Sequence, residues 1–403
     1  MSDLRVGAGT SVAAPAGTAV AEAVAAARRA LGGLDPGLAV LVATVDHEAE
    51  AVYAALRREL PGVRVHGFTS SLGVLGRGGG GAIMGPSGAV GVMLFASAGQ
   101  ARFSVGSASL DGGGRVAGRR AAEELAAAAP GAGSPRILLL ASTPGQEEEV
   151  LAGIAEVFPG TAVYGGSAAD HAIAGGWSIF TERGPRGDGV TLAALFGDVK
   201  VGAAFGAPYE PTPVRAVVTE AEGRSLLRLD GEPAASVLLR WVGDSIADEV
   251  REGGNLLVQT ALRPLGMPVE IQGEGGGHFH RLIHPAFARS TGAVDLFAVP
   301  RPGESLCLMS GTPDSLVAIV EPLIERALAA SDMKAGDARG ALLIYCAGCA
   351  GAIGARIEEV PARLEASLGG AALLGACTFG EQGAVPGLGN LHANLSVGVV
   401  VFG

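Results

Sequence analysis

The chain has 403 residues, of which 48% are hydrophobic and only 4% aromatic, so its 65 glycines and its many alanines supply much of the packing. This length is sufficient for two or three domains with a substantial core. The formal charge is −11, from 29 basic and 40 acidic residues, and the basic residues are dispersed. Dispersed basic residues in an acidic chain argue against binding to a phosphate backbone, so we expect no nucleic-acid partner.

The sequence also argues against a secreted or membrane protein. No uninterrupted apolar run approaches the roughly 20 residues that a membrane helix requires, and the first residues form no apolar signal region. All four cysteines lie in the last quarter of the chain, which is unlike a disulfide framework. We therefore expect a cytoplasmic protein with reduced thiols and no membrane partner.

Taken in chain order, the sequence repeats one plan three times, near residues 4–98, 101–198 and 304–403. Each copy has a strand, an Ala-rich helix, an apolar strand, an amphipathic helix, a strand ending in Gly and small polar residues, and a last apolar strand. The third copy is expected to begin with a strand at Ser305–Met309. The central strand–helix–strand segments are Leu38–Thr44, Glu48–Leu60 and Val63–His66; Ile137–Leu140, Glu147–Phe158 and Ala162–Tyr164; and Leu342–Tyr345, Ile357–Leu368 and Ala371–Leu374. Such self-similarity predicts an α/β fold of repeated β-α-β units with added strands.

The strands and helices of this plan have matching hydrophobic patterns. Strands such as Ile137–Leu140 lack polar alternation, which predicts cover on both faces. The helices supply that cover, because Val52, Leu56 and Leu60 form one apolar stripe. Pro322 and Pro361 are expected to start or kink the helices of the third copy.

A segment at about residues 199–301 does not follow the plan. It is predicted to contain strands at Val214–Thr219 and Ser225–Leu229, an Asp230-Gly231 turn and a helix at Pro233–Val242. We interpret it as an inserted mixed α+β segment within a two-domain arrangement. The expected domains are residues 1–200 and residues 201–403.

Several separated motifs resemble those of the FIST family. Gly165-Gly-Ser-Ala-Ala-Asp170, followed by Trp177–Phe180 and Gly189–Phe196, is similar to the N-terminal half of that family. Three further motifs are similar to the C-terminal half of the family: Pro213–Ala234, Tyr345-Cys-Ala-Gly-Cys349, and Gly380-Glu381 with Asn390–Asn394. The motifs occur in the family's order and span nearly the whole chain.

The resemblance implies a cytoplasmic sensory module that binds a small ligand such as an amino acid, found with bacterial signalling domains or with F-box partners in eukaryotes. The sequence contains no recognisable kinase, cyclase, receptor-coupling or DNA-binding segment, so we expect a separate signalling protein as partner. Cys349 stands where the family commonly has Arg. If that Arg anchors a carboxylate, the ligand of this chain differs.

Small and polar residues follow the predicted strands of all three copies. Because ligands of α/β sheets bind beyond the carboxyl ends of strands, these residues predict a pocket. Asp170 or Glu381 could accept hydrogen bonds from an ammonium group. Ordinary turn chemistry also explains Gly followed by Ser or Thr, and duplication would copy such turns. The candidate ligand-binding residues are Ser70, Ser167, Asp170, Arg281, Cys346, Cys349, Thr378, Glu381, His392 and Asn394.

The C-terminal half is the expected location of the pocket. Glu381 and Arg281 are predicted to recognise opposite charges of one ligand, and Glu381→Ala to abolish binding while leaving the fold intact. Arg281 could instead form an ordinary ion pair. If ligand binding required Asp170 and not Glu381, the site would instead lie in the N-terminal half.

The cysteines and histidines allow other interpretations. Cys346 and Cys349 could form a redox pair, could bind zinc together with Cys377 and His392, or could pack as small thiols beneath the pocket. We favour packed thiols and no bound metal, because a second Cys-x-x-Cys is missing. Some FIST relatives are haem-based nitric-oxide sensors, and one His near 278–284, predicted as strand or loop, could be an axial ligand. The special motif of those sensors is not recognised, so we expect no cofactor and keep haem as the alternative.

Enzymatic motifs are weak. Ser70-Ser71 lacks the Gly-x-Ser-x-Gly elbow, and the glycine-rich runs at 77–81 and 273–277 lack the Gly-Lys-Ser/Thr ending of a phosphate loop. Asp170 and His171 are adjacent, and adjacent strand-end residues usually point apart. We therefore expect a binding module and not an enzyme, with an enzyme acting on a small metabolite as the remaining alternative.

Overall fold

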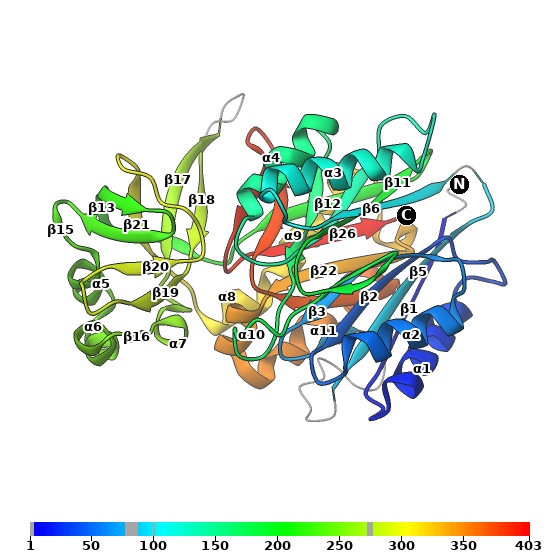
Figure 1. Ribbon diagram of the computed structural model, residues 1–403, viewed down its shortest axis with the longest axis horizontal. Helices are drawn as coiled ribbons and strands as arrows, with labels where there is room; N and C mark the ends of the chain where they lie inside the picture. Colours follow the sequence, from blue (N-terminus) through cyan, green and yellow to red (C-terminus); the bar gives the residue numbers. More distant parts are fainter. Residues whose placement is uncertain (1–3, 77–87, 100, 272–276) are drawn as a thin grey trace.

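A computed structural model describes residues 4–76, 88–99, 101–271 and 277–403. It shows an α/β core with a separate inserted sheet at one end (Figure 1). The glycine-rich runs at 77–81 and 273–276 lie outside the described residues. Within the described ranges, no helix has both the length and the apolar character needed to cross a membrane.

Three mixed sheets build the core, and each has the same strand order: first, last, second and third strand of one copy, then one or two strands of another copy. The second and third strands run parallel in every case. This order confirms the predicted repetition of β-α-β units with added strands. In order, the sheets are β1 (Leu4–Ser11), β5 (Val90–Ser97), β2 (Leu38–Thr44), β3 (Arg64–Ser70), β9 (Ile179–Thr181) and β10 (Gly184–Arg186); β6 (Arg102–Ala108), β11 (Val190–Phe196), β7 (Ile137–Ser142), β8 (Val163–Ser167), β24 (Glu381–Val385) and β25 (Gly389–Ala393); and β12 (Val201–Gly206), β26 (Val397–Phe402), β22 (Gly340–Cys346), β23 (Ala372–Thr378) and β4 (Val74–Gly76).

The added strands are exchanged cyclically among the copies. The second copy contributes β9 and β10 to the first sheet, the third copy contributes β24 and β25 to the second sheet, and the first copy contributes β4 to the third sheet. None of the three sheets is therefore built from one contiguous copy.

The prediction that Ser305–Met309 begins the third copy is wrong. That segment forms β21 (Ser305–Ser310), which pairs with β13 (Glu210–Glu222) and β17 (Leu265–Ile271) of the inserted sheet. The first strand of the third copy is β12, paired with β26. The insertion thus follows the first strand of this copy. The prediction failed because two short apolar strands can have the same local sequence pattern and differ only in the strands with which they pair.

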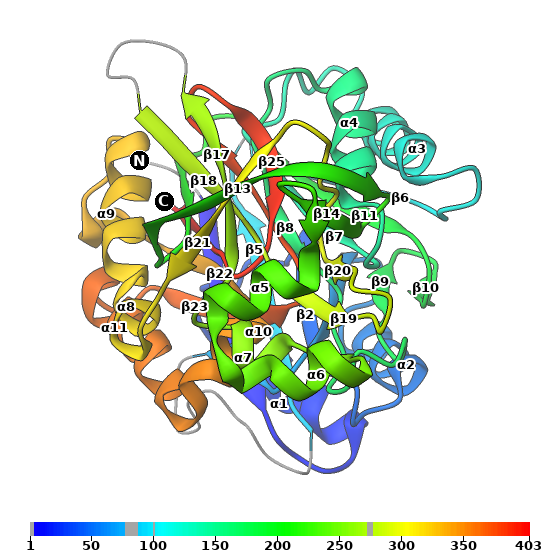
Figure 2. The same ribbon diagram turned by 90° about the vertical axis from the view of Figure 1, so that its left-hand side faces the viewer.

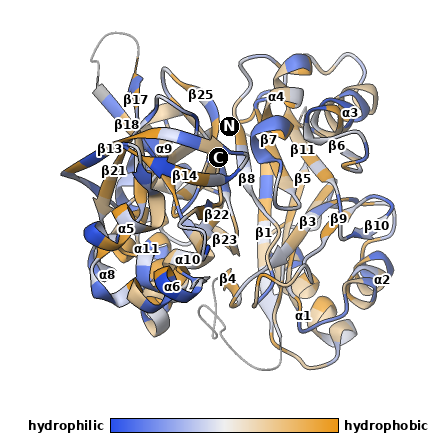
Figure 3. Ribbon diagram, turned by 60° about the vertical axis from the view of Figure 1, so that its left-hand side comes forward, coloured by the Kyte–Doolittle hydropathy of each residue, from blue (hydrophilic) through white to orange (hydrophobic). Residues whose placement is uncertain are grey.

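Side chains along the central strands alternate between two cores. On β2, Leu38, Val40 and Val42 face a core shared by the three sheets, while Ala39 and Leu41 face the helices of their own copy. The near-continuous hydrophobicity of these strands therefore reflects cover on both faces, as predicted. Figure 3 shows the contrast between strand β11, which is mostly orange, and the mostly blue helix α6 (Ala247–Glu252).

Two helices cover the outer face of each sheet. They are α1 (Ala16–Arg29) and α2 (Ala49–Glu59), α3 (Gly114–Ala127) and α4 (Glu147–Val157), and α9 (Val320–Ala330) and α11 (Glu359–Leu368). Pro322 and Pro361 lie in the first turns of α9 and α11, where a missing N–H is tolerated. The shorter helices α8 (Pro313–Ala318) and α10 (Ala347–Ile353) belong to the same copy.

The insertion forms a sheet with its own hydrophobic core. In Figure 2 the molecule is turned so that the insertion faces the viewer. The predicted strand at 225–229 and the helix at 233–242 are confirmed as β14 and α5. Its further elements are β15 (Glu232–Pro233), β16 (Gly254–Asn255), β18 (Gly277–Ile283), β19 (Pro285–Ala288) and β20 (Val294–Leu296), with β14 (Ser225–Leu229), α5 (Ala234–Val242) and α7 (Leu257–Thr260). The histidines at 278 and 280 lie on strand β18, as predicted.

Candidate functional site

The three glycine turns meet at one end of the core. Gly67, Gly165 and Gly375 are equivalent, because each is paired with a leucine of the neighbouring parallel strand. A Cβ on Gly67 or Gly165 would lie only 2.0 or 1.9 Å from the carbonyl oxygen of that leucine. Close backbone approach therefore explains glycine at these positions.

A ring of three backbone hydrogen bonds joins the turns. Two residues after each glycine, a carbonyl oxygen accepts from the equivalent N–H of another copy. The bonds run from Ser71 to Cys377 at 2.9 Å, from Ala169 to Thr69 at 2.8 Å, and from Phe379 to Ser167 at 3.2 Å. The three strand ends therefore meet at one place, where backbone hydrogen bonds hold them together.

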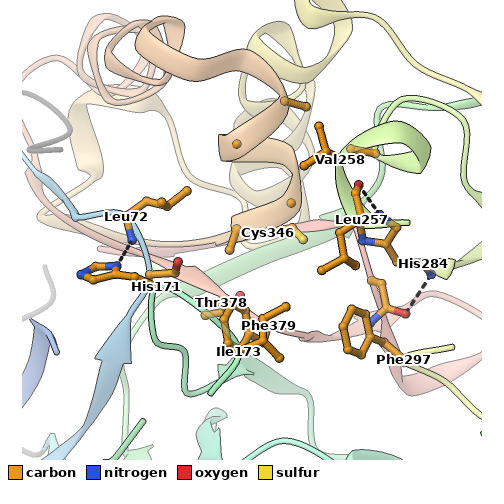
Figure 4. Close-up of a pocket in the computed structure, with 17 residues that line it drawn as sticks. Leu72, His171, Ile173, Leu257, Val258, His284, Phe297, Cys346, Thr378 and Phe379 are labelled. Atoms are coloured by element: carbon orange, nitrogen blue, oxygen red, sulfur yellow. Dashed lines mark hydrogen bonds between the residues drawn. The ribbon is translucent and has the colours of Figure 1, made fainter. Parts of the chain in front are cut away.

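A cavity of about 270 Å³ lies beside this ring, between the core and the insertion. Figure 4 shows Leu72 and His171 on one side, Leu257 and His284 on the opposite side, and Thr378 between them. The wall is mostly apolar, with a few polar groups, as in many small-molecule sites. The lining residues are Ser71, Leu72, His171, Ile173, Leu257, Val258, Ala261, His284, Phe297, Cys346, Ala347, Gly348, Gly351, Ala352, Thr378, Phe379 and Asn394.

His284 and Asn394 form the polar part of the insertion side. The His284 ring holds Nε2 at 3.1 Å from the carbonyl oxygen of Leu257, which can only accept, so Nε2 carries the proton. Burial lowers the pKa of His284 to about 4, which keeps the ring neutral. The backbone N–H of His284 donates to Asn394 Oδ1 at 3.2 Å.

Glu381 lies behind the cavity wall and not in it. Its side chain is fully buried, and it accepts hydrogen bonds from Thr378 Oγ1 at 2.7 Å and from the Ser396 N–H at 3.2 Å. Burial raises the pKa of this carboxyl well above its usual range. Burial thus favours the uncharged form of the acid, and Glu381 does not line the cavity, so the predicted contact with an ammonium group is not supported by this arrangement.

The cysteines are buried thiols. Cys346 lines the cavity, whereas Cys349 lies beneath it, with Sγ 3.4 Å from the Tyr209 hydroxyl. All four cysteines are free and buried, and burial raises the pKa of the Cys346 thiol well above its usual range. Ser70 is also beneath the wall, where its Oγ accepts from the Cys377 N–H at 2.8 Å.

Asp170 organises a loop. Its carboxylate accepts from the N–H groups of four residues that follow it, Ala172, Ile173, Ala174 and Gly176. Burial opposes ionisation, but these hydrogen bonds outweigh it and lower the pKa of Asp170. The predicted role in binding an ammonium group is not supported by this arrangement, because the oxygens already have partners.

The loop that Asp170 organises carries His171 to the cavity mouth. Leu72 N–H donates to His171 Nδ1 at 3.1 Å, and Nε2 lies 2.9 Å from Asp46 Oδ2. His171 therefore pairs with Asp46 and not with its neighbour Asp170. Burial opposes ionisation of Asp46, but the hydrogen bond from His171 contributes to a lowered pKa.

Arg281, His392 and Ser167 belong to a second polar cluster. Arg281 and His392 line another cavity, of about 520 Å³, together with Glu148. Arg281 Nη1 lies 3.9 Å from Glu148, and Ser167 Oγ donates to Glu147 at 2.8 Å. Arg281 thus forms the alternative ion pair, and the structure does not bring it and Glu381 to the same cavity.

The second cluster contains a group of three possible metal ligands within the described part of the chain, Glu147, Glu148 and His392. Arg224 pairs with both carboxylates, with Nη2 at 2.7 Å from Glu147 and 3.1 Å from Glu148, and Arg281 Nη1 lies 3.9 Å from Glu148. The two guanidinium groups together balance the two negative charges of this cluster.

Three of the ten predicted residues line the central cavity: Cys346, Thr378 and Asn394. Sequence reasoning expected the insertion to contribute Arg281 and considered a His near 278–284 only as a haem ligand; the insertion side is instead formed by Leu257, His284 and Phe297. No local signal marks Leu257 and Phe297, since their place depends on how the insertion docks. His171 was considered only with Asp170, and no sequence pattern linked it to Asp46.

The fold and this cavity define an α/β protein with a mostly apolar cavity at the junction of a repeated core and an inserted sheet. The family model of the FIST N domain matches residues 37–232, and that of the FIST C domain matches residues 234–384. The chain therefore belongs to the FIST family, whose domains are associated with signal transduction and small-ligand sensing.

Two solved structures give distant likenesses. One is described as "Cyanuric acid hydrolase: evolutionary innovation by structural concatenation", with TM-score 0.31 and 10% identity over 99% of this chain and 100% of the other. Another is the structure of PurLQS from Thermotoga maritima, with TM-score 0.23 and 9% identity over 100% and 73%. Neither is close enough to support an inference about function. Comparison with curated proteins found no match.

Proposed function

We propose that this chain is a cytoplasmic sensory protein that binds a small metabolite in the central cavity and signals to a separate protein. The observation that carries the proposal is the position of the cavity. Its wall combines the joined strand ends of the core with Leu257, His284 and Phe297 of the insertion. A ligand there would contact both bodies and favour the arrangement that fits it best, which is the requirement for a ligand-driven change.

The proposal includes no catalysis. The cavity wall contains the Cys346 thiol and the imidazoles of His171 and His284, and thiol and imidazole are the side chains most often used as nucleophile or base. Burial raises the pKa of the Cys346 thiol and lowers that of the His284 ring, which therefore favours an unreactive thiol and a neutral imidazole. Four free thiols also suit a reducing compartment such as the cytoplasm.

Gly351 provides a variant that tests the proposal. It lies on α10 in the cavity wall, and a Cβ added there would meet no atom within 4 Å. Leu is a better helix former than Gly, so Gly351→Leu should fill the cavity without unfolding the helix. Gly17 on α1 is the matched control, because an added Cβ there has only one contact, at 3.6 Å, with the mobile end of Arg58.

The experiment is to purify the three proteins from cells, denature them and identify released small molecules by mass spectrometry. Amino acids and similar polar metabolites are then tested by thermal shift. We expect a metabolite with wild type and Gly17→Leu, and none with Gly351→Leu. A Soret band would support haem instead, turnover of the metabolite would support an enzyme, and equal binding by Gly351→Leu would place the site elsewhere.

A further inference from the structure

We propose that the ligand is an uncharged molecule with an apolar body and an amide group, whose carbonyl oxygen accepts from Asn394 Nδ2 and whose N–H donates to His284 Nδ1. This inference rests on the proposed function and specifies the class of ligand for the same cavity. It follows from the hydrogen-bonding groups that the protein leaves unused and from the charges that the wall lacks.

Asn394 supplies the unused donor. The residue is 2% exposed and lines the cavity. Its Oδ1 accepts from the His284 N–H, which fixes the amide orientation, because the reverse orientation would set one donor against another. Nδ2 then has no hydrogen-bond partner among the described residues. A buried amide donor without a partner is unfavourable, and a ligand carbonyl would satisfy it.

His284 supplies the acceptor. Its proton lies on Nε2, bonded to the Leu257 carbonyl, so Nδ1 has a free lone pair. A Cβ on Gly348, a residue of the cavity wall, would lie 3.4 Å from this Nδ1. The same Cβ would lie 2.9 Å from Leu395 Cδ2 and 3.2 Å from His284 Cε1, so a side chain at 348 would crowd this edge of the ring and glycine leaves it uncovered. An amide presents a carbonyl oxygen and an N–H together, which matches this donor and acceptor.

The wall offers no partner for a charged ligand. None of the 17 lining residues is Asp, Glu, Lys or Arg. Glu381 lies behind Thr378, is fully buried and does not line the cavity. His171, at the mouth, is occupied by Leu72 and Asp46. A carboxylate or ammonium group placed here would be desolvated without a counter-charge, which strongly disfavours it.

The remaining wall selects an apolar body. Leu257 and Phe297 of the insertion face Ile173 and Phe379 of the core across the cavity, as Figure 4 shows. Ile173 is 40% and Val258 86% exposed, so apolar side chains also surround the entrance. Burial of such surfaces against a hydrocarbon or aromatic group is favourable and adds no demand for charge.

The test compares two probes that differ in charge but not in shape, phenylacetamide and phenylacetate, by calorimetric titration of the full-length chain. Asn394→Asp is the informative variant, since it keeps an oxygen for the His284 N–H and removes the Nδ2 donor. Gly17→Leu and Gly351→Leu are titrated in parallel, and the melting temperature of each variant is measured to confirm that it is folded.

We expect phenylacetamide to bind at least tenfold more tightly than phenylacetate, and its binding to weaken at least tenfold in Asn394→Asp and to vanish in Gly351→Leu. Absent binding of phenylacetamide, or equal or tighter binding of phenylacetate, would overturn the inference. A charged metabolite that co-purifies with wild type but not with Gly351→Leu would also overturn the inference, while leaving the proposed function intact. Failure of the proposed function is distinguished by a natural ligand that Gly351→Leu still retains.

Discussion

At the scale of single residues, burial favours the uncharged form of an acid behind the cavity wall. Glu381 is an acid whose hydrogen bonds to Thr378 and Ser396 hold the turn after β23. Its pKa is raised by burial, so the folded state keeps a proton that the unfolded state releases above its ordinary pKa. The stability that this group contributes is therefore present at low pH and is lost as the pH rises toward the folded-state pKa.

Replacing Glu381 by Gln should remove that loss. The amide has the same shape, accepts from the Ser396 N–H and donates to Thr378 without ever ionising. We expect Glu381→Gln to be stabilised relative to wild type, and more so at about pH 8 than at about pH 5. Urea unfolding at both pH values provides the measurement, and parallel pH profiles for the two proteins would argue against a neutral Glu381.

Glu381→Ala should behave differently from both. It leaves the buried N–H of Ser396 without its acceptor, and we expect a loss of about 1–3 kcal/mol in the free energy of unfolding. The sequence-based expectation that this variant keeps an intact fold is therefore replaced. Equal stability of the Ala variant and wild type would show that the hydrogen bonds of Glu381 are dispensable.

Buried neutral histidines have the opposite pH dependence. Burial lowers the pKa of His66 from 6.5 to about 3, and its Nδ1 has no partner among the described residues. The unfolded chain takes up a proton below about pH 6.5, so stability falls as the pH is lowered from there toward 3. His66→Leu should reduce this loss by roughly 2–3 kcal/mol at about pH 4.5. Acid unfolding curves test this, with His278→Gln at an exposed position as control; a curve unchanged in His66→Leu would contradict it.

At the scale of elements, glycines set how closely helices approach. A Cβ on Gly118 of α3 would lie 2.2 Å from the Val150 carbonyl oxygen of α4. Ala is the better helix former by about 1 kcal/mol, but this contact leaves no room for it. We expect Gly118→Ala to lower the free energy of unfolding by about 1–3 kcal/mol.

Gly17→Ala is the matched control for this prediction. Its added methyl group meets only the mobile end of Arg58, so helix propensity decides and the variant should be slightly more stable than wild type. Thermal or urea unfolding of both variants provides the comparison. Stabilisation by Gly118→Ala would mean that α3 and α4 are not in backbone contact.

The exchanged strands also predict how the halves of the chain behave. The second sheet is completed by β24 and β25, which lie in residues 201–403, and β4 of the first half completes the third sheet. A fragment of residues 1–200 would expose the unpaired edge of β8. We expect it to unfold without a cooperative transition by circular dichroism and to gain one when mixed with residues 201–403. A cooperative melt of the isolated fragment would contradict this expectation.

At the scale of the whole molecule, hydrophobic patterns predicted the elements but not their partners. Leu38–Thr44 and Ile137–Leu140 read as doubly covered strands because burial determines residue type position by position. The pairing of β9, β4 and β24 with strands of other copies produces no such sequence pattern, since the sequence of a short apolar strand does not indicate which strand lies beside it. The same ambiguity led to the misplacement of Ser305–Met309.

For the site, as for the fold, the sequence predicted local features but not which segments pack together. The three glycine turns were found because close backbone approach requires glycine at Gly67, Gly165 and Gly375. Leu257 and Phe297 were not found, and His284 was considered only as a haem ligand, because the wall that they form depends on how the insertion packs against the core. The charged candidates Asp170 and Arg281 already have partners within the protein, and residue type alone does not reveal this.

The central claim is that a small ligand binds in the cavity between the core and the insertion. The most direct test is calorimetric titration of the metabolite released from the purified protein, using wild type, Gly351→Leu and Gly17→Leu. The account predicts one binding event per chain in wild type and Gly17→Leu and none in folded Gly351→Leu. Undiminished binding in folded Gly351→Leu would contradict it.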